Sequence, residues 1–132
     1  MQKFEKIKIP TFSDDRGDLS VLEFRNFFNW TPERLYYVTG TKKARGGHCV
    51  KGEKKIYLMM QGSCSAKIYD GANWYEIELN GPDDALIFHD ELWREFENFS
   101  ENAVMAAICN AKYDKNLYIT DLKDYQNYIN NK

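Results

Sequence analysis

Short runs of alternating or apolar residues recur along the chain between turn signals, and this pattern constrains the fold more than any other feature. The runs have the length of β-strands and are rich in aromatic and β-branched residues: 6–9, 19–24, 35–38, 55–60, 65–69, 74–79, 85–88 and 104–110. Asp70-Gly71 predicts a hairpin, and residues 80–83 mark the next reversal, so we expect an antiparallel meander. Many short strands favour an all-β fold, either a barrel or a two-sheet sandwich of jelly-roll type.

Two segments stand out from this pattern. Residues 104–109 are apolar on both faces, which predicts a central, buried strand. Near the end of the chain, Leu122, Tyr125 and Ile129 follow helical spacing, with Thr120 or Asp121 as candidate N-cap. We therefore expect one short C-terminal helix, packed on the outside of the strands.

The length of 132 residues suits one hydrophobic core, so residues 1–132 are interpreted as a single domain. The 18 basic and 20 acidic side chains nearly balance, whereas nucleic-acid-binding proteins carry a marked basic excess. A small-molecule partner is therefore favoured over nucleic acid. No apolar run approaches the roughly 20 residues of a membrane span, and the first residues do not form a signal peptide, so a cytoplasmic location is expected.

The composition also argues against a metal or disulfide framework. The three cysteines lack paired spacing, which favours reduced, packed thiols. His48 and His89 are too few for a histidine-rich metal site, and Cys49 faces the opposite side of a strand from His48. We expect neither a metal nor another cofactor.

His48 is the leading catalytic candidate, because an imidazole with an ordinary pKa of about 6.5 suits proton transfer at neutral pH. It follows two glycines, and Val50 shares its strand face. A hydrogen-bonded structural role is the competing interpretation. His89 is expected to be a solvated loop residue.

Several arginines are candidate ligand contacts, because guanidinium pairs well with phosphate oxygens. Arg34 and Tyr36 share one face of a strand and could line a site, while the opposite face, with Leu35 and Tyr37, should be packed. Arg16 and Arg45 each precede a glycine, where the backbone can approach a ligand closely. Surface ion pairs are the alternative for each arginine.

Taken together, these segments resemble the sugar-nucleotide 3,4-ketoisomerases, the WxcM-like group of the cupin superfamily. The likeness extends over nearly the whole chain and rests on Asp15-Arg16-Gly17-x-Leu19 with Glu23, Pro32-x-Arg34-x-Tyr36-Tyr37, Arg45-Gly46-x-His48, Gly62-Ser63-Cys64, Asp70-Gly71, Trp93, Phe99-Ser100, and Tyr113 with Tyr118-Ile119.

The resemblance implies a cupin jelly roll that acts without a metal on a dTDP-linked 4-keto-6-deoxyhexose. The family's reaction moves the keto group from C4 to C3 by proton transfer through an enediol, and it supplies deoxyamino sugars for surface glycans. His48 would be the base and Tyr36 an acid or orienting group. The expected substrate contacts are Arg16, Arg34, Arg45, Trp93 and Arg94.

The resemblance also implies a homodimer, often with strands exchanged between subunits. The apolar run Phe27-Phe28-Asn29-Trp30 is consistent with a contact surface of this kind.

Two departures from the family pattern leave alternatives open. Val50 stands where the family typically has a second histidine, and Arg94 replaces the histidine that often follows the tryptophan. Both changes remove a proton carrier. The alternatives are a non-catalytic member that binds a nucleotide sugar, and an enzyme that uses the barrel for another small polar substrate.

Overall fold

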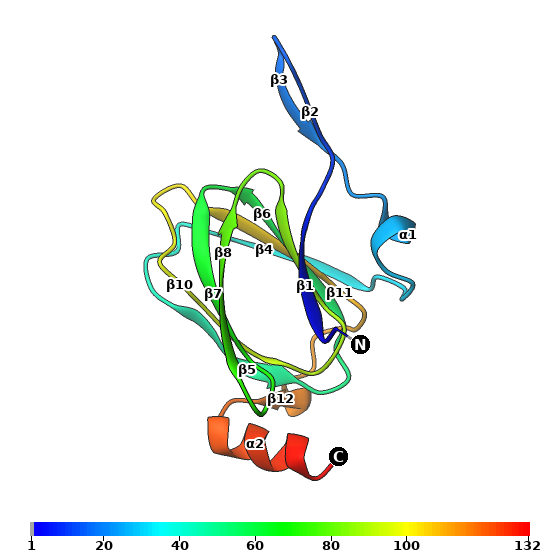
Figure 1. Cartoon of the computed structure of the whole chain (residues 1–132), viewed down its shortest axis with the longest axis vertical. Coiled ribbons are helices and arrows are strands. Elements are labelled where there is room, and N and C mark those ends of the chain that lie inside the picture. Colours follow the sequence, from blue (N-terminus) through cyan, green and yellow to red (C-terminus); the bar gives the residue numbers. More distant parts are fainter. Residues whose placement is uncertain (1) are drawn as a thin grey trace.

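Alternation of inward and outward side chains builds two five-stranded antiparallel sheets that face each other (Figure 1). The computed structural model describes residues 2–132. The first sheet has the order β1-β9-β6-β11-β4, with β1 (Phe4–Lys8), β9 (Asp84–Phe88), β6 (Lys55–Gln61), β11 (Val104–Cys109) and β4 (Arg34–Thr39). The second has the order β12-β5-β10-β7-β8, with β12 (Tyr118–Ile119), β5 (Arg45–Val50), β10 (Trp93–Glu97), β7 (Ser63–Tyr69) and β8 (Trp74–Asn80).

This strand order confirms the all-β, jelly-roll class, with two sheets that do not close into a barrel. The prediction of a meander was wrong beyond the β7–β8 hairpin. After β8 the chain crosses to the other sheet, where β9 pairs with both β1 and β6. The reason is burial: every residue of β9 is buried, so this strand needs neighbours on both sides.

The main core lies between the sheets and is formed by inward-facing residues of both. As predicted, β11 is an internal strand, paired with β4 on one side and β6 on the other. Its Met105 and Ala107 point into the core, while Ile108 packs on the outer face of the sheet. The buried members of the core are Tyr57, Met59, Cys64, Ala66, Ile68, Leu79, Leu86, Phe88, Leu92, Phe96, Ala103, Met105 and Ala107.

A short helix, α1 (Phe24–Phe27), and the segment after it cover the outer face of the first sheet. A strand was expected over 19–24, but the strand ends at Ser20 and the helix begins at Phe24. Phe28 and Trp30 stack with ring centroids 3.8 Å apart and pack into the cluster that contains Ile56. The apolar run 27–30 thus packs largely within its own chain, which removes it as the reason for expecting a dimer.

The predicted C-terminal helix is α2 (Leu122–Asn130), which lies outside the second sheet. Asp121 is the N-cap, and its carboxylate accepts a hydrogen bond from the backbone N–H of Asp124 at 3.0 Å. Tyr125 is fully buried in a cluster with Cys49 and Trp93. A 3₁₀ turn, η1 (Lys115–Leu117), leads into β12. Of the helices described, none has both the length and the apolar character needed to cross a bilayer.

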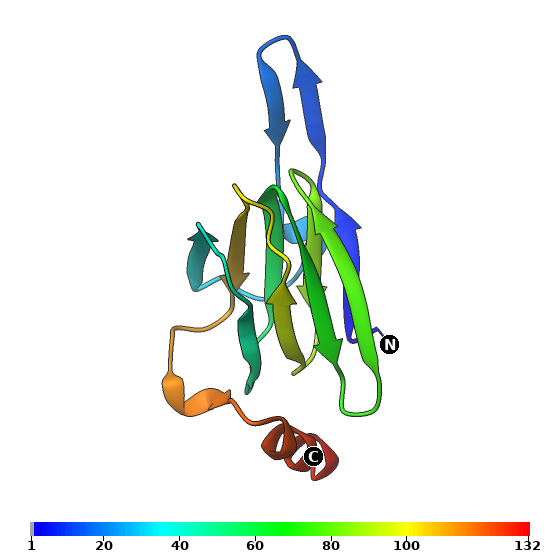
Figure 2. The same cartoon turned by 90° about the vertical axis from the view of Figure 1, so that its left-hand side faces the viewer.

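The hairpin of β2 (Thr11–Asp14) and β3 (Gly17–Ser20) projects beyond the sheets, as Figure 2 shows. Its Phe12 and Leu19 are 65% and 61% exposed. The outward side chains of β4 are exposed as well: Leu35 is 62% and Tyr37 is 67% exposed. The expectation that this face of β4 is packed was therefore wrong for the single chain, because the apolar cluster on the outer face of the sheet does not include Leu35 or Tyr37.

Candidate active site

One end of the space between the sheets is polar, in contrast to the apolar core beside it. On β6, alternation points Lys55, Tyr57 and Met59 inward, so a lysine begins a strand face that otherwise belongs to the core. In the register of the first sheet, Cys109 of β11 lies opposite both Arg34 and Lys55. The ends of β4, β6 and β11 therefore bring their polar residues together.

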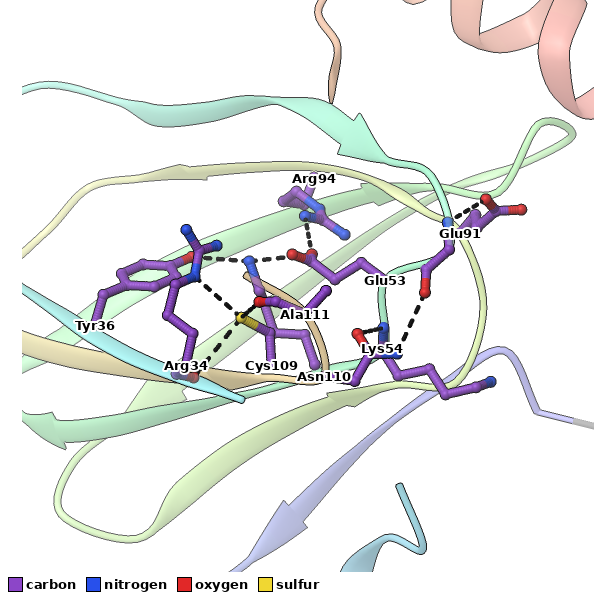
Figure 3. Close-up of polar contacts among 11 residues, drawn as sticks. Arg34, Tyr36, Glu53, Lys54, Glu91, Arg94, Cys109, Asn110 and Ala111 are labelled. Atoms are coloured by element: carbon purple, nitrogen blue, oxygen red, sulfur yellow. Dashed lines mark hydrogen bonds and ion pairs between the residues drawn. The ribbon is translucent and has the colours of Figure 1, made fainter. Parts of the chain in front are cut away.

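Three charged side chains form a buried ion cluster at this end: Glu53, Lys55 and Arg94. The Glu53 Oε1 atom lies 3.1 Å from Lys55 Nζ and 3.0 Å from Arg94 Nη1, so one carboxylate pairs with two cations. Figure 3 shows the contact between Glu53 and Arg94. Lys55 also donates a hydrogen bond to the Tyr36 hydroxyl at 2.9 Å. The ion cluster thereby joins β10 to the tyrosine on β4.

Lys55 and Arg94 remain cations in this setting. Burial opposes the charged form of Lys55, but Tyr57, Tyr36 and Glu53 raise its pKa above the ordinary value. Arg94 stacks over the Phe88 ring, with its guanidinium carbon 4.8 Å from the ring centroid. One carboxylate and two cations leave a net positive charge inside the site.

His48 lies next to this positive charge. Its cross-strand partner is Arg94 of β10, and its ring centroid is 4.9 Å from that of Tyr118. Burial, followed by the positive charge of Arg94, lowers the pKa of His48 to about 4. The imidazole is therefore neutral at physiological pH and can accept a proton. The half-buried ring is also reachable from solvent.

The neighbourhood of His48 disfavours a metal ion, because Arg94 and Lys55 would repel it. Within residues 2–132 there is no group of three or more His, Cys, Asp or Glu side chains arranged to hold one.

Arg34 completes the polar end from β4. Its guanidinium carbon lies 5.3 Å from the ring centroid of Tyr36 and 5.6 Å from that of Tyr113. The Nε atom donates to the Cys109 Sγ atom at 3.4 Å, as Figure 3 shows. These contacts hold a half-buried cation in place, and its planar set of N–H donors suits an anionic ligand.

The structure brings four of the predicted site residues together: His48, Tyr36, Arg34 and Arg94. Arg45 begins the same strand as His48 but is exposed and lies opposite Phe96, away from the ion cluster.

Arg16 and Trp93 are not in this group. Arg16 is at the tip of the projecting β2–β3 hairpin, where it pairs with Asp14. Trp93 precedes Arg94 on β10 and so faces the opposite side, into the cluster under α2, with its Nε1 donating to Glu95 at 2.8 Å. Within one chain, neither side chain contacts the polar end.

His89, expected to be a solvated loop residue, directly follows β9 and is half-buried, with its Nε2 atom 3.1 Å from Glu5 Oε1. The thiols of Cys49, Cys64 and Cys109 are free and buried, as predicted. Val50 is buried on the same strand face as His48.

Glu53 and Lys55 were missed by the sequence interpretation. A signal was present: within the predicted strand 55–60, Lys55 shares the face of Tyr57 and Met59. A lysine on a core-facing register needs a buried partner, and Glu53 is two residues earlier.

Comparison with known proteins agrees with this geometry. Residues 2–130 match the family described as FdtA: WxcM-like, C-terminal. A TDP-4-oxo-6-deoxy-alpha-D-glucose-3,4-oxoisomerase from Aneurinibacillus thermoaerophilus is 30% identical over 125 residues, which cover 93% of this chain and 90% of that protein.

Solved structures of similar fold include a 3,4-ketoisomerase from Helicobacter canadensis, with a TM-score of 0.91, 31% identity, and coverage of 98% of this chain and 99% of that one. A second is the 3,4-ketoisomerase QdtA from Thermoanaerobacterium thermosaccharolyticum, a histidine-to-asparagine mutant in complex with TDP-4-keto-6-deoxyglucose. Its TM-score is 0.91 at 25% identity, with coverage of 100% and 97%. The matched length, the shared jelly roll and the ordered motifs together establish that the chain belongs to the FdtA, WxcM-like C-terminal family.

Proposed function

We propose that the protein is a sugar-nucleotide 3,4-ketoisomerase, which converts a dTDP-linked 4-keto-6-deoxyhexose into the 3-keto sugar. The observation that carries this proposal is a neutral, solvent-reachable imidazole, His48, beside a buried positive charge. The relative from Aneurinibacillus thermoaerophilus is named for a TDP-4-oxo-6-deoxyglucose, and the QdtA mutant is in complex with TDP-4-keto-6-deoxyglucose. The product would be a precursor of deoxyamino sugars in surface polysaccharides.

The chemistry needs a base, a way to stabilise negative charge and a path for the returning proton. His48 removes the C3 proton, and the electron pair moves into a C3–C4 double bond with negative charge on O4. Arg94 supplies a positive charge that favours this enediolate, and Tyr36 is the acid that gives O4 a proton. Proton transfer from O3 and protonation of C4 then give the 3-keto sugar, so the reaction is redox-neutral and consumes no co-reactant.

Substrate binding is assigned first to Arg34, since its guanidinium is half-buried at the polar end and lies near two aromatic rings. Its planar N–H groups match the oxygens of a pyrophosphate. Arg16, Arg45 and Trp93 stay predictions as substrate contacts. Calorimetry with dTDP checks the binding half of the proposal: a folded sample that gives neither heat nor a thermal shift at millimolar dTDP refutes it.

We also infer a homodimer. Four large apolar side chains are more than half exposed on the projecting hairpin and on the outer face of β4: Phe12, Leu19, Leu35 and Tyr37. A second copy that covers these residues would remove a surface that is costly to leave in water. It would also bring Arg16 against the partner subunit. Light scattering tests this inference, and a monomer mass across a wide concentration range contradicts it.

The deciding experiment for the activity is NMR of dTDP-4-keto-6-deoxyglucose incubated with the protein in D₂O. Loss of the C3 proton signal reports abstraction even where net isomerisation is slow. We expect exchange, followed by signals of the 3-keto sugar. Binding of dTDP without exchange would instead support a non-catalytic nucleotide-sugar-binding member. In an active enzyme, His48→Asn should abolish exchange while leaving dTDP affinity nearly unchanged.

A further inference from the structure

Lys55 is a fully buried cation that touches a residue of the proposed reaction. Its Nζ atom lies 2.9 Å from the Tyr36 hydroxyl and 3.1 Å from Glu53 Oε1. It also lies over the rings of Tyr36 and Tyr57, at 4.9 and 5.2 Å from their centroids. The ammonium group is therefore held on several sides and directed at one hydroxyl.

We propose that Lys55 is a positioning residue for the isomerisation, which orients the Tyr36 hydroxyl toward the sugar and stabilises the negative charge that this hydroxyl takes on. This inference rests on the proposed function and adds a residue to its mechanism.

The direction of the hydrogen bond carries the first step. An ammonium group has three donors and no acceptor, so Tyr36 must accept from Lys55. The phenolic proton of Tyr36 is then left to point elsewhere, as a donor to the substrate. Lys55 thus selects the orientation in which Tyr36 can act as an acid.

The ion cluster carries the second step. Glu53 binds Lys55 and Arg94 with the same oxygen, which fixes both cations and cancels only one of their charges. The surplus positive charge exists before substrate arrives, so no reorganisation is needed when Tyr36 gives its proton to O4 and its own oxygen becomes negative. Lys55 stabilises the resulting phenolate.

His48 and Tyr36 together account for every proton that moves in the reaction. His48 takes the C3 proton, and Tyr36 gives its proton to O4, which yields a neutral enediol, an imidazolium and a phenolate. The phenolate then takes the O3 proton as the C3 carbonyl forms, and C4 takes a proton from His48. Both side chains end as they began, and Lys55 stays charged throughout.

Stability alone does not explain the ion cluster. Desolvation of buried charges offsets much of their attraction, and apolar residues of similar volume are often as stabilising. The cluster nevertheless stands in a chain where Val50 provides no second imidazole on the face of His48. The Lys55–Tyr36 pair supplies the second proton-transfer group that this strand face lacks.

The first test compares Lys55→Met with Lys54→Met. Lys54 is the exposed neighbour, and its Nζ binds the backbone carbonyl of His89. We expect Lys55→Met to lower kcat for C3 exchange and isomerisation about 100-fold, the usual effect of losing one charge-stabilising group, with little change in dTDP affinity. Lys54→Met should behave as wild type. A merely structural role would instead weaken binding and folding with kcat of the folded fraction unchanged.

The second test is a double-mutant cycle with Tyr36→Phe. If Lys55 acts through the Tyr36 hydroxyl, the double variant should lose no more than about threefold beyond either single variant, because the two residues act as one unit. If the loss of kcat in the double variant equals the product of the two single losses, the proposal is overturned. Lys55→Gln replaces Lys55→Met where the latter does not fold, since the amide can still donate to Tyr36 but carries no charge. If Lys55→Gln keeps the kcat of the wild type, the proposal is likewise overturned. If the wild type itself is inactive, the ketoisomerase function is refuted instead.

Discussion

Glu53→Gln should destabilise the protein far more than the loss of an ordinary ion pair. Glu53 is 4% exposed, and its carboxylate is the anionic partner of both Lys55 and Arg94. The substitution preserves size but leaves two neighbouring cations buried without a counter-charge. Breaking a buried pair in this way typically costs about 3–5 kcal/mol, because the remaining charge is neither hydrated nor paired.

Glu97→Gln is the matched control, because it makes the same chemical change in an exposed pair. Glu97 lies 2.9 Å from Lys67, a distance close to those of Glu53, but the two side chains are 34% and 37% exposed. An exposed pair contributes about 0–1 kcal/mol. The contrast between the two variants therefore isolates the effect of burial from the effect of losing a carboxylate.

Urea unfolding followed by tryptophan fluorescence provides the measurement. We expect the midpoint of Glu53→Gln to fall strongly at an unchanged m-value, while the midpoint of Glu97→Gln stays near that of the wild type. Equal losses below about 1 kcal/mol in both variants would show that Glu53 is hydrated in solution and does not hold a buried ion cluster.

Three further outcomes follow from the geometry. The pKa of His48 is lowered to about 4 in the folded protein, so the unfolded chain binds more protons than the folded chain below pH of about 6.5, and the free energy of unfolding should fall as the pH drops from there toward 4. For the same reason C3 exchange in the NMR assay should persist until the pH nears 4, and a midpoint of the exchange rate near pH of about 6.5 would be inconsistent with this site. Burial raises the pKa of the Cys49 thiol to about 12, so a thiol reagent should modify it only upon unfolding, and rapid labelling of the folded protein would contradict the structure. Gly46 has φ of +90°, and a Cβ there would lie 2.8 Å from the Arg94 carbonyl oxygen, so Gly46→Ala should lower the free energy of unfolding by about 1–3 kcal/mol in urea. An unchanged free energy of unfolding would show that β5 can shift away from Arg94.

The elements that the sequence predicted well depend on local signals. The cap at Asp121, the hairpin at Asp70-Gly71 and the apolar strand at 104–109 are each determined by residues within a few positions. The meander failed because pairing is non-local. The turn after Asn80 is compatible with a hairpin, but the burial of β9 on both faces favours a place between β1 and β6.

The candidate site shows the same contrast between local signals, which the sequence contains, and contacts between remote segments, which it does not reveal. Strand alternation was sufficient to place Arg34 with Tyr36, and it also implies that Trp93 and Arg94 cannot face the same side. The burial of Lys55 depends on partners from β4 and β10 that are remote in sequence, so its role emerges only after the sheets pack. In the single chain Arg16 pairs with Asp14 on the projecting hairpin, so its role as a substrate contact stays a prediction.

The replacement of a second histidine by Val50 changes the physical character of the site. A second imidazole would titrate near neutral pH, whereas a buried lysine with a raised pKa keeps its charge across that range. The surplus cation also helps to keep His48 unprotonated, because protonation would place another positive charge beside Arg94 and Lys55. One base and one fixed cation can therefore divide the work that two titrating histidines would otherwise share, and the departure at Val50 is compatible with catalysis.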